Sequence, residues 1–335
     1  YRTHLPEVAE RLQRLLREAP SRSSPLRGAD AGGATLPVDT DSRLELLRFE
    51  HVAELEAEPI FAPDLGAQLR QVVEERKGIE RLEAQGLNPT RSLLFTGPPG
   101  VGKTLAARWI ARELGLPLLI LDLSAVMSSF LGRTGNNLRY VLDYAKGTES
   151  VLLFDELDSI AKRRDDATEV GELKRLVTVL LQEIDDWPPE GLLIAATNHP
   201  DLLDPAVWRR FDLVLDFPMP KGDAVAAALE QFLGHDQNVD AQWKLVLGHA
   251  LKEASFSDIE RCAMQLRRAA ALGNGATRGG LARLVRAHVD RLPWKERVGL
   301  AQEFTAMGEL SQRFIHELTG ISREKIRKEA REAEA

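Results

Sequence analysis

The sequence lacks the features that would mark a secreted, membrane-spanning or nucleic-acid-coating protein. It holds one cysteine, Cys262, so no internal disulfide can form and a reducing compartment fits best. Its apolar runs are short, and none approaches the ~20 residues that a helix needs to span a bilayer. No signal-peptide pattern opens the chain, which starts with Tyr1. The formal net charge of −7 argues against a protein that mainly coats nucleic acid. We therefore expect a cytoplasmic protein with no membrane segment, and the net charge disfavours a nucleic-acid partner.

The chain does contain enough apolar material for two compact domains. It has 335 residues, of which 44% are hydrophobic. From Ser92 to Pro220, short apolar runs alternate with helix-like stretches, and this order predicts an α/β domain with a parallel sheet. Residues 223–290 have helical spacing throughout, which indicates a second, smaller domain made of helices. The five apolar runs are SLLFTG, LPLLILDLS, SVLLFDE, GLLIAATN and DLVLDFPMP.

The segment that follows the first apolar run predicts a phosphate site. In FTGPPGVGKTLAA, glycines and prolines break the chain between a strand and a helix. Main-chain amides of such a loop, together with the start of the next helix, form a site for anions. Lys103 adds a positive charge for the β- and γ-phosphates, and the Thr104 hydroxyl can ligate Mg²⁺. We expect ATP and Mg²⁺ here, bound by Gly97, Pro98, Pro99, Gly100, Val101, Gly102, Lys103, Thr104 and Leu105.

Polar residues at the ends of two later runs are expected to face the same crevice. Asp155 and Glu156 end SVLLFDE, and Asn198 ends GLLIAATN. Ligands of open α/β sheets bind at the carboxyl ends of the strands, so these side chains would meet the phosphate loop. Asp155 would hold Mg²⁺, and Glu156 would accept a proton from the attacking water. Asn198 would orient that water, although an asparagine before His-Pro is also a common turn residue.

An arginine pair follows a helix start marked by proline. In LLDPAVWRRFD, Arg209 and Arg210 could contact phosphate in their own site or reach into the site of a neighbouring subunit. An arginine supplied in trans is worth about 10³- to 10⁵-fold in turnover. A salt-bridged pair on the surface is the simpler alternative. The spacing does not decide between these three readings.

At this point the chain resembles the AAA ATPases, a family within the AAA+ superfamily. GPPGVGKT resembles their Walker A loop, LLFDELD their Walker B strand, and ATNHPDLLDPAVWRRFD their second region of homology. The resemblance implies a five-stranded P-loop ATPase core, a four-helix lid, and a ring of subunits, usually six, with ATP between neighbours. It implies Mg-dependent ATP hydrolysis in which Glu156, Asn198, Arg209 and Arg210 are catalytic. The chain departs from many relatives in having the two arginines adjacent.

The resemblance, which covers roughly residues 65–290, and the composition of the two ends together divide the chain into five regions. Residues 44–220 would form the ATPase core and residues 221–292 the lid. The core would be preceded by an N-terminal helix and a flexible linker, because residues 1–20 have helical spacing and residues 21–43 are rich in Ser, Gly and Pro. Residues 293–335 would be a C-terminal helical extension.

Members of this family thread polypeptide through a central pore by means of an aromatic loop residue. MSSFLGRTGNNLRYVLDYA resembles that loop, with Phe130 as the aromatic residue and Leu131 and Gly132 after it. Many relatives carry lysine before the aromatic residue, where this chain has Ser129. The charged stretch 162–173 occupies the position of a second pore loop, but such a stretch is more often a solvated loop.

The C-terminal tail and the overall function leave alternatives open. The tail around Gly320 faintly resembles a helix-turn-helix, but its balanced charges favour a helical pair that packs on the lid or on a neighbour. We expect a motor that remodels, unfolds or disassembles protein substrates, alone or with a separate protease or adaptor. The alternatives are a nucleic-acid-directed ATPase and an ATP-dependent switch or scaffold.

Overall fold

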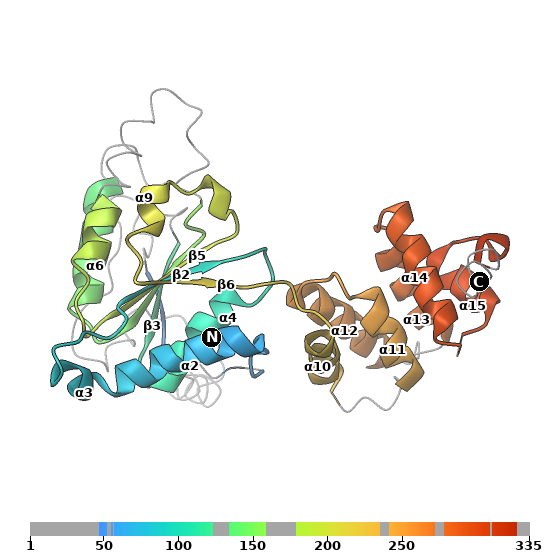
Figure 1. Ribbon diagram of the computed structural model, residues 1–335, viewed down its shortest axis with the longest axis horizontal. Coiled ribbons are helices and arrows are strands. Elements are labelled where there is room, and N and C mark those ends of the chain that lie inside the picture. The colour runs from blue at the N-terminus through green and yellow to red at the C-terminus, as the bar shows by residue number, and fades with distance from the viewer. Residues whose placement is uncertain are drawn as a thin grey trace, which may run out of the picture.

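The computed structural model describes a sheet-containing body followed by a helical body (Figure 1). The described residues are 47–51, 55, 57–122, 134–158, 179–234, 241–271, 278–308 and 310–326. The predicted N-terminal helix, the linker, the proposed pore residues Phe130, Leu131 and Gly132, and the charged stretch 162–173 lie outside them. Among the described residues, no helix combines the length and the apolar character needed to cross a membrane.

The first body contains a six-stranded sheet of order β1-β3-β4-β5-β2-β6. The five strands predicted from the apolar runs are present and parallel, so this expectation is confirmed. The sixth strand, β1, pairs antiparallel with β3 at the edge and was not predicted. It has four residues, of which only Leu47 is buried, and so carries too little periodicity to be recognised. The strands are β1 (Leu47–Glu50), β2 (Ser92–Thr96), β3 (Leu118–Asp122), β4 (Val151–Asp155), β5 (Leu192–Thr197) and β6 (Leu213–Asp216).

Both faces of the central strands are buried, which explains why these strands are apolar without alternation. In β2, Leu94 packs into a cluster on one face, whereas Leu93 and Phe95 pack into a second cluster on the other. The first face is covered by α6 (Thr134–Lys146) and the second by α2 (Pro63–Lys77) and α4 (Lys103–Leu114). Helix α2 is followed directly by the short α3 (Ile79–Glu83).

The strand order brings the predicted site residues to one edge of the sheet. Strand β5 lies between β4 and β2, and all three run in the same direction. The phosphate loop follows β2, Asp155 ends β4, and Asn198 follows β5 directly. These three segments are distant in sequence, and the parallel pairing places them side by side. The arginine pair follows α9 (Pro205–Trp208), which lies between β5 and β6 in the chain.

The second body consists of helices that share one hydrophobic cluster. Residues of α14 and α15, such as Phe304 and Ile315, pack into the same cluster as Val246 of α11 and Ile259 of α12. The predicted lid helices and the C-terminal pair therefore bury a common core, while the domain boundaries stay predictions. The helices are α10 (Asp223–Leu233), α11 (Ala241–Ala250), α12 (Phe256–Ala271), α13 (Arg278–Val289), α14 (Trp294–Ala306) and α15 (Gln312–Thr319).

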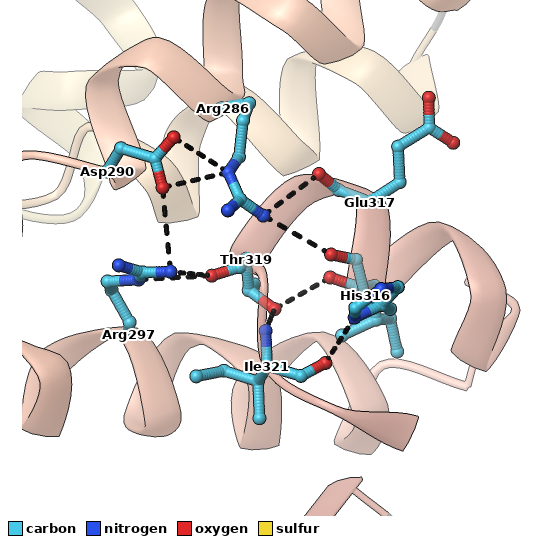
Figure 2. Close-up of polar contacts among 8 residues, drawn as sticks. Arg286, Asp290, Arg297, His316, Glu317, Thr319 and Ile321 are labelled. Carbon is cyan, nitrogen blue, oxygen red and sulfur yellow. Dashed lines mark hydrogen bonds and ion pairs between the residues drawn. The ribbon is translucent and has the colours of Figure 1, made fainter.

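Two arginines fix the carboxyl end of α15, as Figure 2 shows. Arg286 of α13 donates to the carbonyls of His316 and Glu317, at 3.4 and 3.3 Å, and Arg297 of α14 donates to the carbonyl of Thr319 at 2.9 Å. The last carbonyls of a helix have no partner within it, and cations there also complement the helix dipole. Asp290 pairs with both guanidinium groups, at 2.8 and 3.5 Å, which holds the two arginines in position.

The turn after α15 depends on glycine. Gly320 has a φ of +70°, and its N–H donates to the carbonyl of His316 at 2.8 Å. The chain is helical again at residues 323–326, where Ile326 is buried against the same cluster. The helix and turn suggested by the tail are thus present, and the described part of the tail packs on the helical body.

We predict that Gly320→Ala destabilises the protein more than Gly308→Ala. Both glycines have φ near +70°, so alanine is strained at either position by about 1 kcal/mol. A Cβ atom at Gly320 would lie 2.3 Å from Nη2 of Arg286, whereas none of the described atoms outside its chain neighbours lies within 4 Å at Gly308. Displacing Arg286 should add about 1–2 kcal/mol, measured by chemical denaturation. Equal losses for the two variants would contradict this account of the arginine contacts.

Candidate active site

The loop after β2 wraps around the side chain of Lys103. Gly97, Gly100 and Gly102 have φ values of +139°, +77° and +94°, which residues with a side chain rarely adopt. Gly97 has a second constraint, because a Cβ atom there would lie 2.3 Å from the carbonyl oxygen of Phe217. The loop therefore requires glycine for its backbone path as well as for its approach to β6. Helix α4 begins at Lys103 directly after this loop.

The ammonium group of Lys103 is tied to two segments. Nζ donates to the carbonyl oxygens of Gly97 and Pro98, at 2.7 and 2.8 Å, and to Oδ1 of Asn198 at 2.8 Å. These contacts use the three N–H donors of a lysine. The side chain is buried, and this burial lowers its pKa to about 8. The carboxylates of Asp155, Asp158 and Asp216 act in the opposite direction, since negative charges favour the protonated ammonium.

A hydroxyl and a carboxylate meet beside the lysine. Oγ1 of Thr104 donates to Oδ2 of Asp155 at 3.1 Å, so the first turn of α4 contacts the end of β4. Oδ1 of the same carboxylate accepts the backbone N–H of Glu156 at 3.0 Å. The two oxygen ligands that the sequence predicts for a metal are therefore adjacent. Oxygen donors of this kind suit Mg²⁺.

Glu156 stands in a strained backbone conformation at the cavity. Its φ of +54° is the one positive value of a non-glycine residue among the described part of the chain. A conformation of this kind costs about 1–3 kcal/mol and is kept where the surroundings enforce it, commonly at functional sites. The side chain is exposed and lines the cavity, where it can reach water.

The loop, the acidic pair and Asn198 border one cavity of about 750 Å³. This volume is in the range of small-molecule sites in proteins. The other side of the cavity is formed by residues that the sequence analysis did not identify. Ile60 and Phe61 come from the segment before α2, and Phe232 and Phe256 come from the helical body. No periodic pattern marks these residues as a group, because they meet only through the fold.

Among the described residues, two direct hydrogen bonds join the helical body to the segments around this site. The N–H of Ser257, in the first turn of α12, donates to the carbonyl of Gly100 in the phosphate loop at 3.1 Å. The Gln231 amide of α10 donates to the carbonyl of Glu58 at 2.9 Å. Ser255 caps α12 together with Asp258, and the sequence signal for this cap is the S-x-x-D spacing. The start of α12 is thereby fixed against the phosphate loop.

The arginine pair lies away from the cavity. Arg209 and Arg210 are both exposed, and neither is among the residues that line the cavity. Arg210 pairs with Asp185, whereas the side chain of Arg209 has no hydrogen bond or ion pair with any described residue. Val207 and Phe211 are buried on either side of the pair, which holds this segment against the sheet body.

Comparison with known proteins agrees with this geometry. Residues 93–219 match the family model described as "ATPase family associated with various cellular activities (AAA)". The chain is 43% identical over 196 residues to the uncharacterized AAA family ATPase y4kL of Sinorhizobium fredii, which covers 58% of each protein. It is 34% identical over 194 residues to the proteasome-activating nucleotidase of Methanocaldococcus jannaschii, covering 55% of this chain and 45% of the relative. The chain thus spans about half the length of the curated relatives it matches.

A solved structure supports the fold. The crystal structure of the FIGL-1 AAA domain superposes with a TM-score of 0.54 at 22% identity, covering 66% of this chain and 74% of that one. This likeness agrees with a mostly parallel α/β sheet body followed by helices. Within this chain, residues 93–219 therefore match the AAA family of ATPases.

Proposed function

We propose that this chain is a subunit of an ATP-hydrolysing ring that remodels or unfolds protein substrates. The observation that supports ATP hydrolysis is that one cavity is lined by the phosphate loop, by the paired Thr104 and Asp155, and by Glu156. Binding alone would need the loop and a lysine. A carboxylate at the cavity that is free to accept a proton from water is what a hydrolase needs in addition.

In this proposal the loop amides and Lys103 bind the β- and γ-phosphates of ATP. Thr104 and Asp155 would hold Mg²⁺. When bound, this ion would neutralise part of the negative charge of the phosphates. No group of three or more His, Cys, Asp or Glu side chains converges within the described ranges, so the phosphates themselves would complete the metal's ligands. Glu156 accepts the proton of the attacking water, and the Asn198 amide orients that water. The apolar wall of Ile60, Phe61, Phe232 and Phe256 suits the base and ribose.

A ring is supported by the position of the arginines. Neither arginine reaches the cavity of its own chain, yet the charge that develops during phosphoryl transfer is commonly stabilised by an arginine. Arg210 is engaged by Asp185, so Arg209 is the one available to a neighbouring subunit. We therefore infer that Arg209 is the residue that acts in trans and that Arg210 orients the segment. A homo-hexamer is the assembly that the family resemblance favours.

A protein substrate is supported by the relatives that are named proteasome-activating nucleotidases. At 34% identity over about half of their length, these relatives favour a protein-unfolding motor over other uses of ATP. Phe130, with Leu131 and Gly132, would contact the polypeptide in the pore. A separate protease or an adaptor could receive or deliver the substrate.

We predict that Glu156→Gln retains ATP but hydrolyses it about 10²- to 10⁴-fold more slowly, because the glutamine cannot accept the proton. The measurement is phosphate release with Mg²⁺ beside ATP binding by calorimetry, and removal of Mg²⁺ by a chelator should also stop release. Glu149→Gln is a matched control, since Glu149 is exposed and lies near the opposite end of β4. Unchanged turnover in Glu156→Gln would exclude it as the base, and a wild-type protein without ATPase activity would refute the proposed function.

We predict that Arg209→Ala lowers turnover by about 10³-fold while ATP still binds, and that Arg210→Ala has a much smaller effect. Mixing Arg209→Ala with Glu156→Gln subunits should restore part of the activity. In such rings some interfaces join an intact Arg209 from one subunit to an intact Glu156 of the next. A larger loss in Arg210→Ala, or no recovery on mixing, would contradict the assignment of Arg209.

We predict that Phe130→Ala abolishes stimulation of hydrolysis by an unfolded model protein such as casein. The ratio of stimulated to basal rate should fall to about one, because the aromatic contact that grips the chain is lost. Phe130→Tyr is the control, since it keeps the ring and should keep the stimulation. Stimulation by duplex DNA in place of protein would instead favour a nucleic-acid-directed ATPase, and stimulation by neither would favour a switch or scaffold.

A further inference from the structure

Asp158 is a buried carboxylate that none of the roles above includes. It lies three residues after Asp155, beyond the end of β4, and its residue exposure is only 2%. Burying a carboxylate is costly unless hydrogen bonds compensate for the lost water. Asp158 lies next to the site but is not one of the residues that line the cavity, so its carboxylate must have another role there.

The carboxylate of Asp158 binds the segment where β5 ends. Oδ1 accepts the hydroxyl of Thr197 at 3.1 Å and the backbone N–H of Asn198 at 3.2 Å. The N–H of Leu157 donates to the carbonyl of Ala196 at 2.9 Å, so the β4–β5 pairing continues up to this point. Asp158 therefore fixes the main chain of Asn198 relative to the end of β4, which carries Asp155 and Glu156.

This main-chain contact determines where the Asn198 side chain can reach. The amide oxygen of Asn198 accepts Nζ of Lys103 at 2.8 Å, so a continuous path of hydrogen bonds runs from Asp158 through Asn198 to the phosphate-binding lysine. Asn198 follows the last strand residue, where sheet pairing no longer fixes the backbone. Without Asp158 its N–H would lose its acceptor, and the amide would lose its fixed direction.

We propose that Asp158 is a positioning residue for ATP hydrolysis, which acts by holding the backbone of Asn198 so that the Asn198 amide faces the phosphates. This inference rests on the proposed function. Asp158 does not touch the nucleotide in this role, and its effect on turnover passes through Asn198. Removing the carboxylate should leave nucleotide binding by the loop and Lys103 largely intact while turnover falls.

The test is a double-mutant cycle of Asp158→Ala and Asn198→Ala, with kcat and ADP affinity measured for each variant. We expect Asp158→Ala to lower kcat by about 10- to 100-fold, since misplacement of a catalytic group by about 1 Å has effects of this size. In the Asn198→Ala background, Asp158→Ala should have little further effect on kcat, because the two residues act as one unit. ADP affinity should change less than about threefold.

Two more variants separate positioning from stability. Asp158→Asn keeps an acceptor oxygen and should recover most of the turnover, and it also serves if Asp158→Ala does not fold. Ser92→Ala is a control of matched burial, since Ser92 is also 2% exposed and its hydroxyl accepts the N–H of Asp212 at 3.0 Å. Ser92 is the first residue of β2, so it lies at the opposite end of the parallel strands from the site. This control should lower the melting temperature without lowering kcat.

The outcomes distinguish this proposal from the one on which it rests. If the wild-type protein hydrolyses ATP but the two kcat losses multiply in the double variant, Asp158 acts independently of Asn198 and the positioning role is refuted. The same holds if Asp158→Ala behaves like Ser92→Ala, with lower stability and unchanged kcat. If the wild-type protein does not hydrolyse ATP, the proposed function itself fails.

Discussion

The site depends on the hydrogen bonds that hold the Lys103 ammonium between the phosphate loop and Asn198. A buried ammonium is costly, and three acceptors within 2.8 Å offset that cost. Two of the acceptors are loop carbonyls, so the lysine stabilises the same turn that exposes amides to a ligand. The third belongs to Asn198, the residue after β5, so the lysine also links the loop to the end of the neighbouring strand. Loop shape and positive charge are thus set by one interaction.

Parallel pairing of β4, β5 and β2 makes this interaction possible. The three strands end at one edge, and their ends supply a carboxylate, an amide and the glycine loop respectively. Asp158 adds a connection from β4 to β5 just beyond the regular pairing. Hydrogen bonds between the residues that follow β4 and β5 therefore fix the positions of the site residues relative to the sheet. This arrangement explains how the short side chains of Asp155, Asp158 and Asn198 are held at fixed distances from the glycine loop.

The helical body completes the cavity and contacts the phosphate loop. Phe232 and Phe256 line the cavity, and the N–H of Ser257 binds the carbonyl of Gly100. Because Gly100 belongs to the loop that would hold phosphate, a shift of that loop on nucleotide binding would be transmitted to α12. The helical body in turn is one packed unit, whose C-terminal pair is held by Arg286 and Arg297.

The amino-acid sequence by itself determined the five parallel strands, the glycine loop with Lys103 and Thr104, and the polar strand ends at Asp155 and Asn198. These features are local, since each depends on the types and spacing of residues that are near one another in the chain. Only the tertiary structure decided that Arg210 is paired with Asp185 and that Asp158 holds Asn198. It also decided that aromatic residues of both bodies, such as Phe61 and Phe256, line one side of the cavity. The physical reason is that such contacts join residues far apart in sequence. Their partners are selected by strand order and packing, which leave no periodic pattern in the chain.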